Sequence, residues 1–229
     1  MTKMKLQQYA ITADFDGTIT LEDSNDLLFV THGNAKNLKI EADYCAGLVG
    51  GTETMHRHFQ ARRMGLREYF AFLDAHIQID PGFDEFLQYL RVHDLPFFIV
   101  SGGYRQGIQQ ILGTERMKHV VQLFANELLE ENGYLISSGS MEDAVCTEPI
   151  GPCGNCKKVC IDTIRRQSNR KILFIGDGMT DRCAAKEADV LFAKEGCPLV
   201  DYCRAHDLPY IPYTCFDDIT DYFGRSDTM

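Results

Sequence analysis

Two aspartates that lie two residues apart, Asp14 and Asp16, constrain this chain more than any other feature. They end an apolar segment over residues 9–13, which predicts a short buried strand, and Gly17 and Thr18 follow at once. Side chains two positions apart on a strand point to the same face, so both carboxylates are expected on one surface. Two negative charges so close together require a cation or a shared proton. The pair therefore predicts a metal site, an acid/base pair, or a nucleophile beside its acid.

Other apolar segments also end in polar residues that can carry chemistry. Ser101 follows one such segment and Asp177 follows another. Strand patterns cover residues 9–14, 96–100, 171–176, 189–193 and 210–212, and helical patterns cover residues 83–93, 103–112, 156–168, 180–187, 197–206 and 216–223. This alternation predicts an α/β fold, a doubly wound Rossmann-like core with a parallel sheet and helices on both faces. Ligands of such sheets bind beyond the carboxyl ends of the strands, so one pocket is expected to collect Asp14, Ser101 and Asp177.

The chain between the first two strands differs from the rest. Residues 20–80 show helical periodicity and no convincing strand. We therefore expect a core domain of residues 1–19 and 81–229 and an inserted helical domain of residues 20–80. A hairpin is predicted around Asn132-Gly133, because Asn-Gly is a favoured two-residue turn between strands.

Composition excludes several functional classes. A chain of 229 residues can bury a substantial core, and its net charge of −10 argues against non-specific nucleic-acid or membrane binding. No signal peptide is apparent, and no apolar run reaches the roughly 20 residues of a membrane helix. Nine cysteines, an odd number, favour a reducing cytoplasm over a disulfide framework. A homodimer is compatible with the sequence, although no residue argues for one.

Four motifs occur in a fixed order: residues 14–18, Asp-Phe-Asp-Gly-Thr; residues 101–103, Ser-Gly-Gly; a lysine pair at 157–158; and residues 176–181, Gly-Asp-Gly-Met-Thr-Asp. Together they resemble the haloacid dehalogenase (HAD) phosphatase superfamily, over nearly the whole chain. The helical insert and the hairpin resemble its phosphoserine-phosphatase-like subgroup, in which such an insert is a cap that closes over substrate and excludes water.

The resemblance implies a different role for each of four aspartates. Asp14 would be the nucleophile that forms an aspartyl-phosphate, and Asp16 would protonate the leaving alcohol and then activate water. Asp177 would hold Mg²⁺ together with Asp14 and the main-chain carbonyl of Asp16. Asp181 either orients a metal-bound water or caps the helix that begins there.

The resemblance also implies a phosphate site and a catalytic cation. Phosphate oxygens would be held by residues of the first and second motifs: Thr18, Ser101, Gly102 and Gly103. The alternative for Ser101 is a simple helix cap. Lys157 would offset the negative charge of nucleophile and phosphate, with Lys158 as the alternative.

Substrate choice is expected to depend on the insert. Asp23 lies nine positions after Asp14, where amine-recognising relatives place a carboxylate. Basic side chains of the insert could also face the pocket, with Arg62 and Arg63 as the leading candidates, and a solvated helix face is the alternative for most of them: His56, Arg57, His58, Arg62, Arg63 and Arg67.

The C-terminal segments, residues 191–194, 199–204 and 208–213, look closest to the methionine-salvage family. That family dephosphorylates 2-hydroxy-3-keto-5-methylthiopentenyl-1-phosphate. Phosphoserine and phosphocholine or phosphoethanolamine are the alternative substrate classes suggested by related families.

Four cysteines fall within fifteen residues: Cys146, Cys153, Cys156 and Cys160. Cys-x-x-Cys spacing can bind zinc, but a second such pair at the usual zinc-ribbon distance is missing. Reduced thiols that pack a loop against the core, a zinc site and a redox switch all remain open. A non-catalytic zinc- or partner-binding protein on the same fold is the alternative outside enzymology, and the intact set of Asp14, Asp16, Lys157 and Asp177 argues against it.

Overall fold

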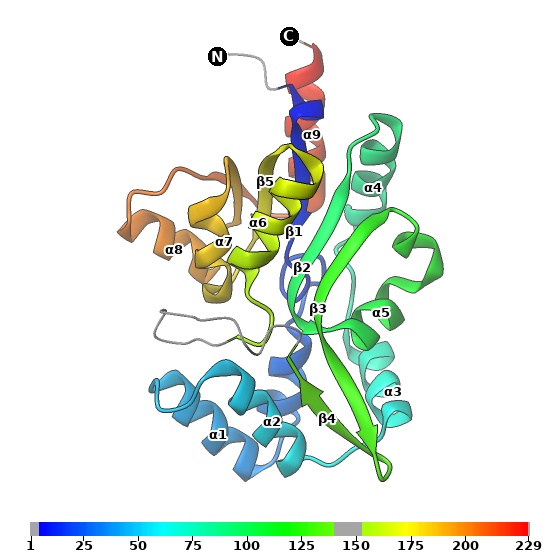
Figure 1. Cartoon of the computed structure of the whole chain (residues 1–229), viewed down its shortest axis with the longest axis vertical. Helices are drawn as coiled ribbons and strands as arrows, with labels where there is room; N and C mark the ends of the chain where they lie inside the picture. Colours follow the sequence, from blue (N-terminus) through cyan, green and yellow to red (C-terminus); the bar gives the residue numbers. More distant parts are fainter. Residues whose placement is uncertain (1–4, 140–152, 229) are drawn as a thin grey trace.

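A mostly parallel sheet organises the chain (Figure 1). The computed structural model describes residues 5–139 and 153–228, and these residues form seven strands in the order β4-β3-β2-β1-β5-β6-β7. The strands are β1 Tyr9–Ala13, β2 Phe97–Tyr104, β3 Val120–Glu131, β4 Tyr134–Ser138, β5 Lys171–Gly176, β6 Val190–Lys194 and β7 Ile211–Tyr213. Every neighbouring pair is parallel except the β3–β4 hairpin. The predicted α/β class with a parallel sheet is confirmed.

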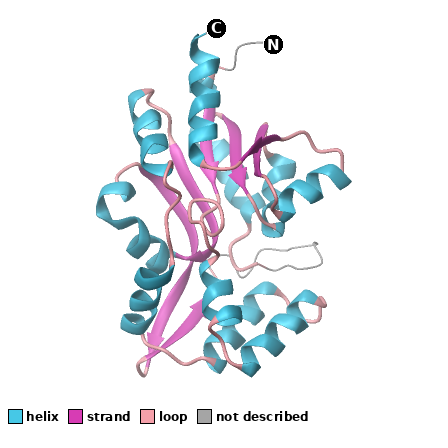
Figure 2. Cartoon of the chain, turned by 180° about the vertical axis from the view of Figure 1, so that it is seen from behind, coloured by secondary structure: helices cyan, strands magenta, loops and turns pink. Residues whose placement is uncertain are grey.

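Helices cover both faces of the sheet (Figure 2). They are α1 Ala35–Cys45, α2 Gly51–Ala61, α3 Leu66–His76, α4 Phe83–Val92, α5 Arg105–Met117, α6 Lys157–Ser168, α7 Arg182–Glu187, α8 Pro198–Ala205 and α9 Phe216–Thr228, with short helices η1 Leu6–Gln8, η2 Asp26–Thr31 and η3 Met179–Asp181. Successive strand residues point to opposite faces, so Ile99 packs with α4 and α9 while Val100 packs with α6. This two-sided burial explains why the strands are almost wholly apolar.

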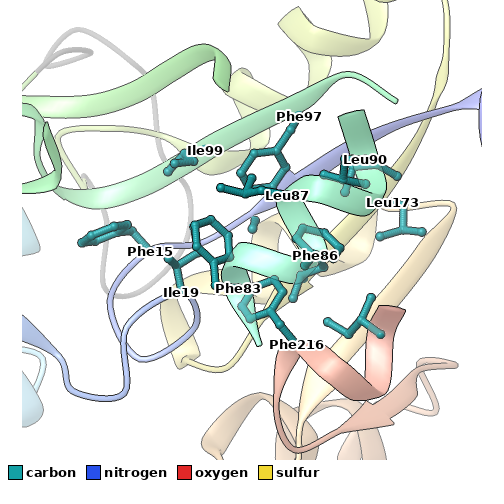
Figure 3. Packing of buried hydrophobic residues seen from close by; sticks show 14 of the residues in the cluster. Phe15, Ile19, Phe83, Phe86, Leu87, Leu90, Phe97, Ile99, Leu173 and Phe216 are labelled. Carbon is teal, nitrogen blue, oxygen red and sulfur yellow. The ribbon is translucent and has the colours of Figure 1, made fainter. Parts of the chain in front are cut away.

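Phenylalanines fill the α4–α9 face of the core (Figure 3). The rings of Phe83, Phe86 and Phe216 are fully buried, and Phe83 meets Phe216 edge to face at 5.1 Å between centroids. Phe15 belongs to the same cluster although it lies between the two aspartates of the first motif. The first motif is therefore anchored in the core by the apolar residue at its centre.

Two element boundaries differ from the sequence prediction. Strand β2 continues through residues 101–103, so α5 begins at Arg105 instead of residue 103. Strand β3 begins at Val120, where the prediction had no strand, and it pairs with β2 before it turns into the predicted hairpin. The Asn-Gly turn marks only the far end of this strand, so the sequence prediction did not include its first half.

The chain leaves and re-enters the core at adjacent points. Thr20 and Ile79 form an isolated antiparallel bridge, and Leu21 N donates to Gln78 O at 2.8 Å. Between these points the chain forms η2, α1, α2 and α3, with no named strand. Helices α1 and α2 lie at the end of the molecule opposite the start of β1 (Figure 1). The division into core and cap domains stays a prediction.

The apolar interior of the insert is shared with the hairpin. Phe29 and Phe59 pack in one cluster with Leu128 of β3 and Leu135 of β4.

None of the helices in the described ranges 5–139 and 153–228 is long and apolar enough to cross a membrane.

Candidate active site

A cavity of about 200 Å³ lies where the carboxyl ends of the central strands meet helices of the insert. Both Asp14 and Asp16 line it, as the spacing of the pair predicts. The remaining lining includes, from the core, Ser101, Gly102, Gly103, Lys157 and Asp177, and, from the insert, Asp23, Phe29, Glu41, Thr54, Met55 and His58. The cavity therefore combines core motifs with side chains of the insert.

Lys157 is a buried cation of this cavity, as is Arg182. Its Nζ lies 2.5 Å from Asp14 Oδ2 and 2.6 Å from Asp181 Oδ1, and its side chain is only 5% exposed. Lys158, the alternative, is half exposed and pairs with Glu187 on the surface. Lys157 is the first residue of α6, so the helix start delivers its side chain to the end of β1.

Asp177 and Asp181 are held by the loop that follows β5. Asp177 Oδ1 accepts a hydrogen bond of 2.5 Å from the Thr18 hydroxyl. Asp181 Oδ2 accepts from the backbone N–H groups of Asp177 and Gly178, both at 3.0 Å. Asp181 makes no side-chain capping bond to α7, but its hydrogen bond from Gly178 N caps the start of η3. Thr18 does not line the cavity, so its hydroxyl positions Asp177 in this structure instead of facing a phosphate.

Gly17 permits the close approach of the first motif to Asp177. Its φ is +74°, a backbone conformation that glycine adopts far more readily than other residues. A Cβ at this position would lie 2.5 Å from Asp177 Oδ2. Glycine is therefore required here both by the backbone and by the neighbouring carboxylate.

Three carboxylates form a group that suits a divalent cation. Oxygen atoms of Asp14, Asp177 and Asp181 all lie within 4.8 Å of one another. Lys157 neutralises one of the three negative charges and leaves two, which a divalent ion matches. Carboxylate oxygens are the ligands that Mg²⁺ prefers, so the donor set is appropriate for it.

Burial makes the ionised forms of these carboxyls costly. Desolvation raises the pKa of Asp14 well above 3.8, and the nearby charge of Asp181 adds to the effect although Lys157 opposes it. Desolvation, with Asp23, raises the pKa of Asp16 to about 7. Desolvation, with Asp181, raises the pKa of Asp177 to about 7. Burial opposes the charge of Lys157, but its ion pairs with Asp14 and Asp181 outweigh this and raise its pKa.

These shifts predict how the stability of the metal-free protein depends on pH. A carboxyl whose pKa is raised by folding stabilises the folded state below its unfolded pKa, and this contribution is lost as pH rises through about 7. We expect the free energy of unfolding to fall by at least about 2 kcal/mol between about pH 5 and pH 8, a loss of about 4–8 °C in Tm. Thermal melting at low ionic strength measures this.

Mg²⁺ should offset this loss, and therefore raise Tm more at about pH 8 than at about pH 5. The Asp177→Asn variant is the matched control, since removing one of the titrating carboxyls should flatten the pH dependence. A Tm that is constant or rises over this pH range would contradict the assignment of these raised pKa values.

The second motif lies in the irregular end of β2, beside Asp16. Gly103 N donates to Ser101 Oγ at 2.9 Å, and a Cβ on Gly103 would lie 2.5 Å from Asp16 Oδ2. Two asparagines fix carbonyls of this segment: Asn155 Nδ2 donates to Ser101 O at 2.7 Å and Asn126 Nδ2 donates to Gly102 O at 2.8 Å. Sequence analysis missed both asparagines, since their partners are distant in the chain.

The cysteines near Lys157 support the loop that carries it. Cys160 is buried, and its thiol donates to Asn155 Oδ1 at 3.2 Å. Cys153 and Cys156 line the cavity. Among the described residues, no cysteine belongs to a group of side chains placed to hold a metal. A zinc site of four thiolates needs Cys146, which lies outside the described residues.

The charged residues of the insert are placed differently from the expectation. Arg62 Nη1 donates to Leu28 O at 2.7 Å, and its guanidinium lies over the ring of Phe72. The guanidinium of Arg63 lies 5.1 Å from the ring centroid of Tyr134. Neither arginine lines the cavity, so neither is placed to contact substrate. Their contacts hold the insert together and attach it to the hairpin.

Asp23 does line the cavity, as expected. Its Oδ1 accepts from the backbone N–H groups of Asn25 at 2.9 Å and Asp26 at 3.0 Å. Of the six basic residues considered in the insert, His58 is the one that lines the cavity. The acidic Glu41 of α1 lines it as well, and sequence analysis missed this residue. The insert therefore contributes three acidic residues to the lining, Asp23, Asp26 and Glu41, beside neutral and apolar side chains.

The fold and the site together define a hydrolase class: a parallel α/β sheet whose central strand ends in a carboxylate pair, beside a buried lysine and further carboxylates. The chain belongs to the haloacid dehalogenase-like hydrolase family, whose model matches residues 11–186, and it is an HAD-type phosphatase.

Individual relatives carry different substrate names. The polyol phosphate phosphatase PYP1 of Saccharomyces cerevisiae is 30% identical over 226 residues, which cover 91% of this chain and 90% of the relative. The 2-hydroxy-3-keto-5-methylthiopentenyl-1-phosphate phosphatase of Bacillus cytotoxicus is 30% identical over 211 residues, which cover 91% and 93%. A substrate-bound phosphoserine phosphatase structure has a TM-score of 0.72 at 18% identity, covering 94% of this chain and 98% of that one, and shows the shared fold.

Proposed function

We propose that this protein is a magnesium-dependent phosphomonoesterase that acts on a small phosphorylated metabolite through an aspartyl-phosphate on Asp14. The contact of Lys157 Nζ with Asp14 Oδ2, at 2.5 Å inside the cavity, carries the proposal. Lys157 lowers the pKa of Asp14 against the larger opposing effect of desolvation, and so favours the ionised carboxylate, which is the form that attacks phosphorus. Phosphoryl transfer depends chiefly on such positioning and neutralisation of charge.

In the first chemical step Asp14 acts as the nucleophile and Asp16 as the general acid. A carboxylate oxygen of Asp14 forms a bond to phosphorus while the bond from phosphorus to the alcohol oxygen breaks. Asp16, with a pKa of about 7, gives its proton to the leaving oxygen. Its Oδ1 is held by Ser24 N at 3.0 Å, while Oδ2 lies beside Gly103.

In the second step Asp16 removes a proton from the water that attacks phosphorus. The bond between phosphorus and the Asp14 oxygen breaks, and inorganic phosphate leaves. The end of β2 at residues 101–103, with Asn126 and Asn155 behind it, is the candidate phosphate site. Lys157 stays close to Asp14 in both steps and offsets the negative charge there.

Mg²⁺ would be held by Asp14, Asp177 and the main-chain carbonyl of Asp16, with Asp181 orienting the ligands from behind. When bound, the ion neutralises negative charge on the phosphate oxygens. Helices of the insert form one side of the cavity and would exclude water from it.

For the substrate we propose 2-hydroxy-3-keto-5-methylthiopentenyl-1-phosphate or a close analogue, supported by the relative from Bacillus cytotoxicus. Polyol phosphates are the second candidate, because Asp23, Asp26 and Glu41 line the cavity and can accept hydrogen bonds from hydroxyl groups. Phosphoserine is less well supported, since its carboxylate would meet this acidic wall. Phosphocholine and phosphoethanolamine remain alternative substrates, because their positive charge suits the same acidic residues. We further propose a reducing, cytoplasmic location from the cysteine content.

Phosphate release from a panel of esters tests the function directly. The panel holds the methionine-salvage enol phosphate, a polyol phosphate, phosphoserine and phosphocholine, each assayed with Mg²⁺ and with EDTA. We expect release that EDTA abolishes and that is strongest for one of the first two esters. Stoichiometric bound zinc without any hydrolysis would instead favour the non-catalytic interpretation.

A further inference from the structure

Glu41 of α1 reaches the cavity wall and is held there by a histidine from the next helix. His58 Nε2 lies 3.4 Å from Glu41 Oε2. The histidine is 2% exposed, and its ring stacks on Phe29 with centroids 4.7 Å apart and planes 10° apart. Glu41, His58 and Phe29 all line the cavity. The stack therefore fixes the plane of the imidazole ring beside Glu41.

The tautomer of His58 follows from a chain of hydrogen bonds. Asn37 Oδ1 accepts from Asn34 N at 3.1 Å in the capping box of α1, which fixes the orientation of the Asn37 amide. Asn37 Nδ2, a donor, therefore faces His58 Nδ1 at 3.1 Å. That ring nitrogen must accept, so the ring proton resides on Nε2 and points to Glu41.

Glu41 consequently remains a negatively charged acceptor. The hydrogen bond from His58 lowers its pKa, although partial burial opposes this. The Asn37 donor keeps Nδ1 of His58 an acceptor, so the ring offers its Nε2 proton to Glu41. Asp23 and Asp26 are close enough for Glu41 to raise the pKa of each, after the larger effect of burial. This part of the wall attracts hydrogen-bond donors and repels anions.

We propose that Glu41 is a specificity-determining residue, positioned by His58, that selects phosphate esters whose distal end carries hydrogen-bond donors and no negative charge. The proposal rests on the proposed phosphatase function. Hydroxyl and ammonium groups both supply the required donors. A distal carboxylate on this side of the cavity would face Asp23, Asp26 and Glu41.

Four three-carbon phosphate esters, in two pairs that each differ only at the distal end, test this proposal: glycerol 1-phosphate with 3-phosphoglycerate, and 3-aminopropyl phosphate with propyl phosphate. Glycerol 1-phosphate carries hydroxyls, 3-aminopropyl phosphate carries an ammonium, propyl phosphate carries no donor, and 3-phosphoglycerate carries a carboxylate. With Mg²⁺, we expect the wild-type kcat/KM to be higher for the two donor esters than for propyl phosphate, and lowest for 3-phosphoglycerate. The values of kcat/KM for glycerol 1-phosphate and 3-aminopropyl phosphate show whether hydroxyl or ammonium is the preferred donor.

Glu41→Gln keeps the shape and the acceptor for His58 but removes the charge. We expect the ratio of kcat/KM for the preferred donor ester to kcat/KM for propyl phosphate to fall about 10-fold, chiefly through KM. The corresponding ratio for 3-phosphoglycerate should rise. His58→Phe, which preserves the stack on Phe29, should shift the same ratios less. Glu53→Gln is the matched control, since Glu53 is exposed on α2 and pairs with Arg57.

Should Glu41→Gln fail to fold, Glu41→Asp tests the same ratios through a shortened side chain and should lower the donor preference. Unchanged ratios in an active variant would overturn this inference alone. A wild type that prefers 3-phosphoglycerate would overturn it as well. Absence of Mg²⁺-dependent release from all four esters and from the panel above would overturn the proposed function, and this inference with it.

Discussion

Asp14→Asn is expected to lower phosphate release by at least about ten-thousand-fold while the protein stays folded. The amide of Asn is no nucleophile towards phosphorus, so the aspartyl-phosphate cannot form. Folding should survive because desolvation disfavours the charge of Asp14, and because Lys157 keeps its ion pair with Asp181 at 2.6 Å. Steady-state kinetics on the preferred ester and a urea unfolding curve measure the two effects.

The control for this variant is Asp84→Asn. Asp84 is exposed on α4 and pairs with Arg116, far from the cavity lining. It should leave turnover unchanged and alter stability by no more than about 1 kcal/mol. Near-wild-type activity of Asp14→Asn would remove the proposed mechanism, whereas loss of folding would show that Asp14 is needed for the structure itself.

Lys157→Met is expected to produce the largest loss of stability of any single change at this site. It leaves Asp14 and Asp181 buried, adjacent and without their common cation. Removing one partner of a buried ion pair typically costs about 3–5 kcal/mol, because the remaining charge is desolvated and uncompensated. Urea unfolding at about pH 8 measures this cost, and it should shrink at lower pH as the carboxyls take up protons.

Lys158→Met distinguishes this effect from the loss of any lysine at the start of α6. The Lys158 side chain is 52% exposed and pairs with Glu187 at the surface. Exposed ion pairs contribute little, so a change of at most about 1 kcal/mol and near-normal turnover are expected. Equal losses in the two variants would contradict the choice of Lys157 as the catalytic cation.

Much of the fold could be predicted because its strands are buried on both faces. Such strands appear in the sequence as continuous apolar runs, and the polar residue after each run marks the edge where the cavity forms. The Asn-Gly turn likewise identified the β3–β4 hairpin. The start of β3 was missed because the Asn-Gly turn marks only the hairpin end of this strand, whereas β3 joins the sheet at Val120.

The insert was harder to predict because its helices each bury only part of their surface. Basic residues occur throughout residues 54–67, and their spacing does not show which of them face the cavity. Packing turned His58 inward, where it stacks on Phe29, and turned Arg62 towards the carbonyl of Leu28. Glu41 lies in the cavity lining because α1 packs against α2, where His58 contacts it. Contacts between two helices cannot be predicted from a local sequence pattern.

The sequence by itself determined the α/β class, the order of the motifs and the meeting of Asp14, Asp16 and Asp177, since each depends on neighbouring residues and on the geometry of parallel strands. Only the tertiary structure decided that Lys157 and not Lys158 pairs with Asp14, and which charges of the insert line the cavity. Those outcomes depend on how helices distant in the sequence rotate and pack against one another.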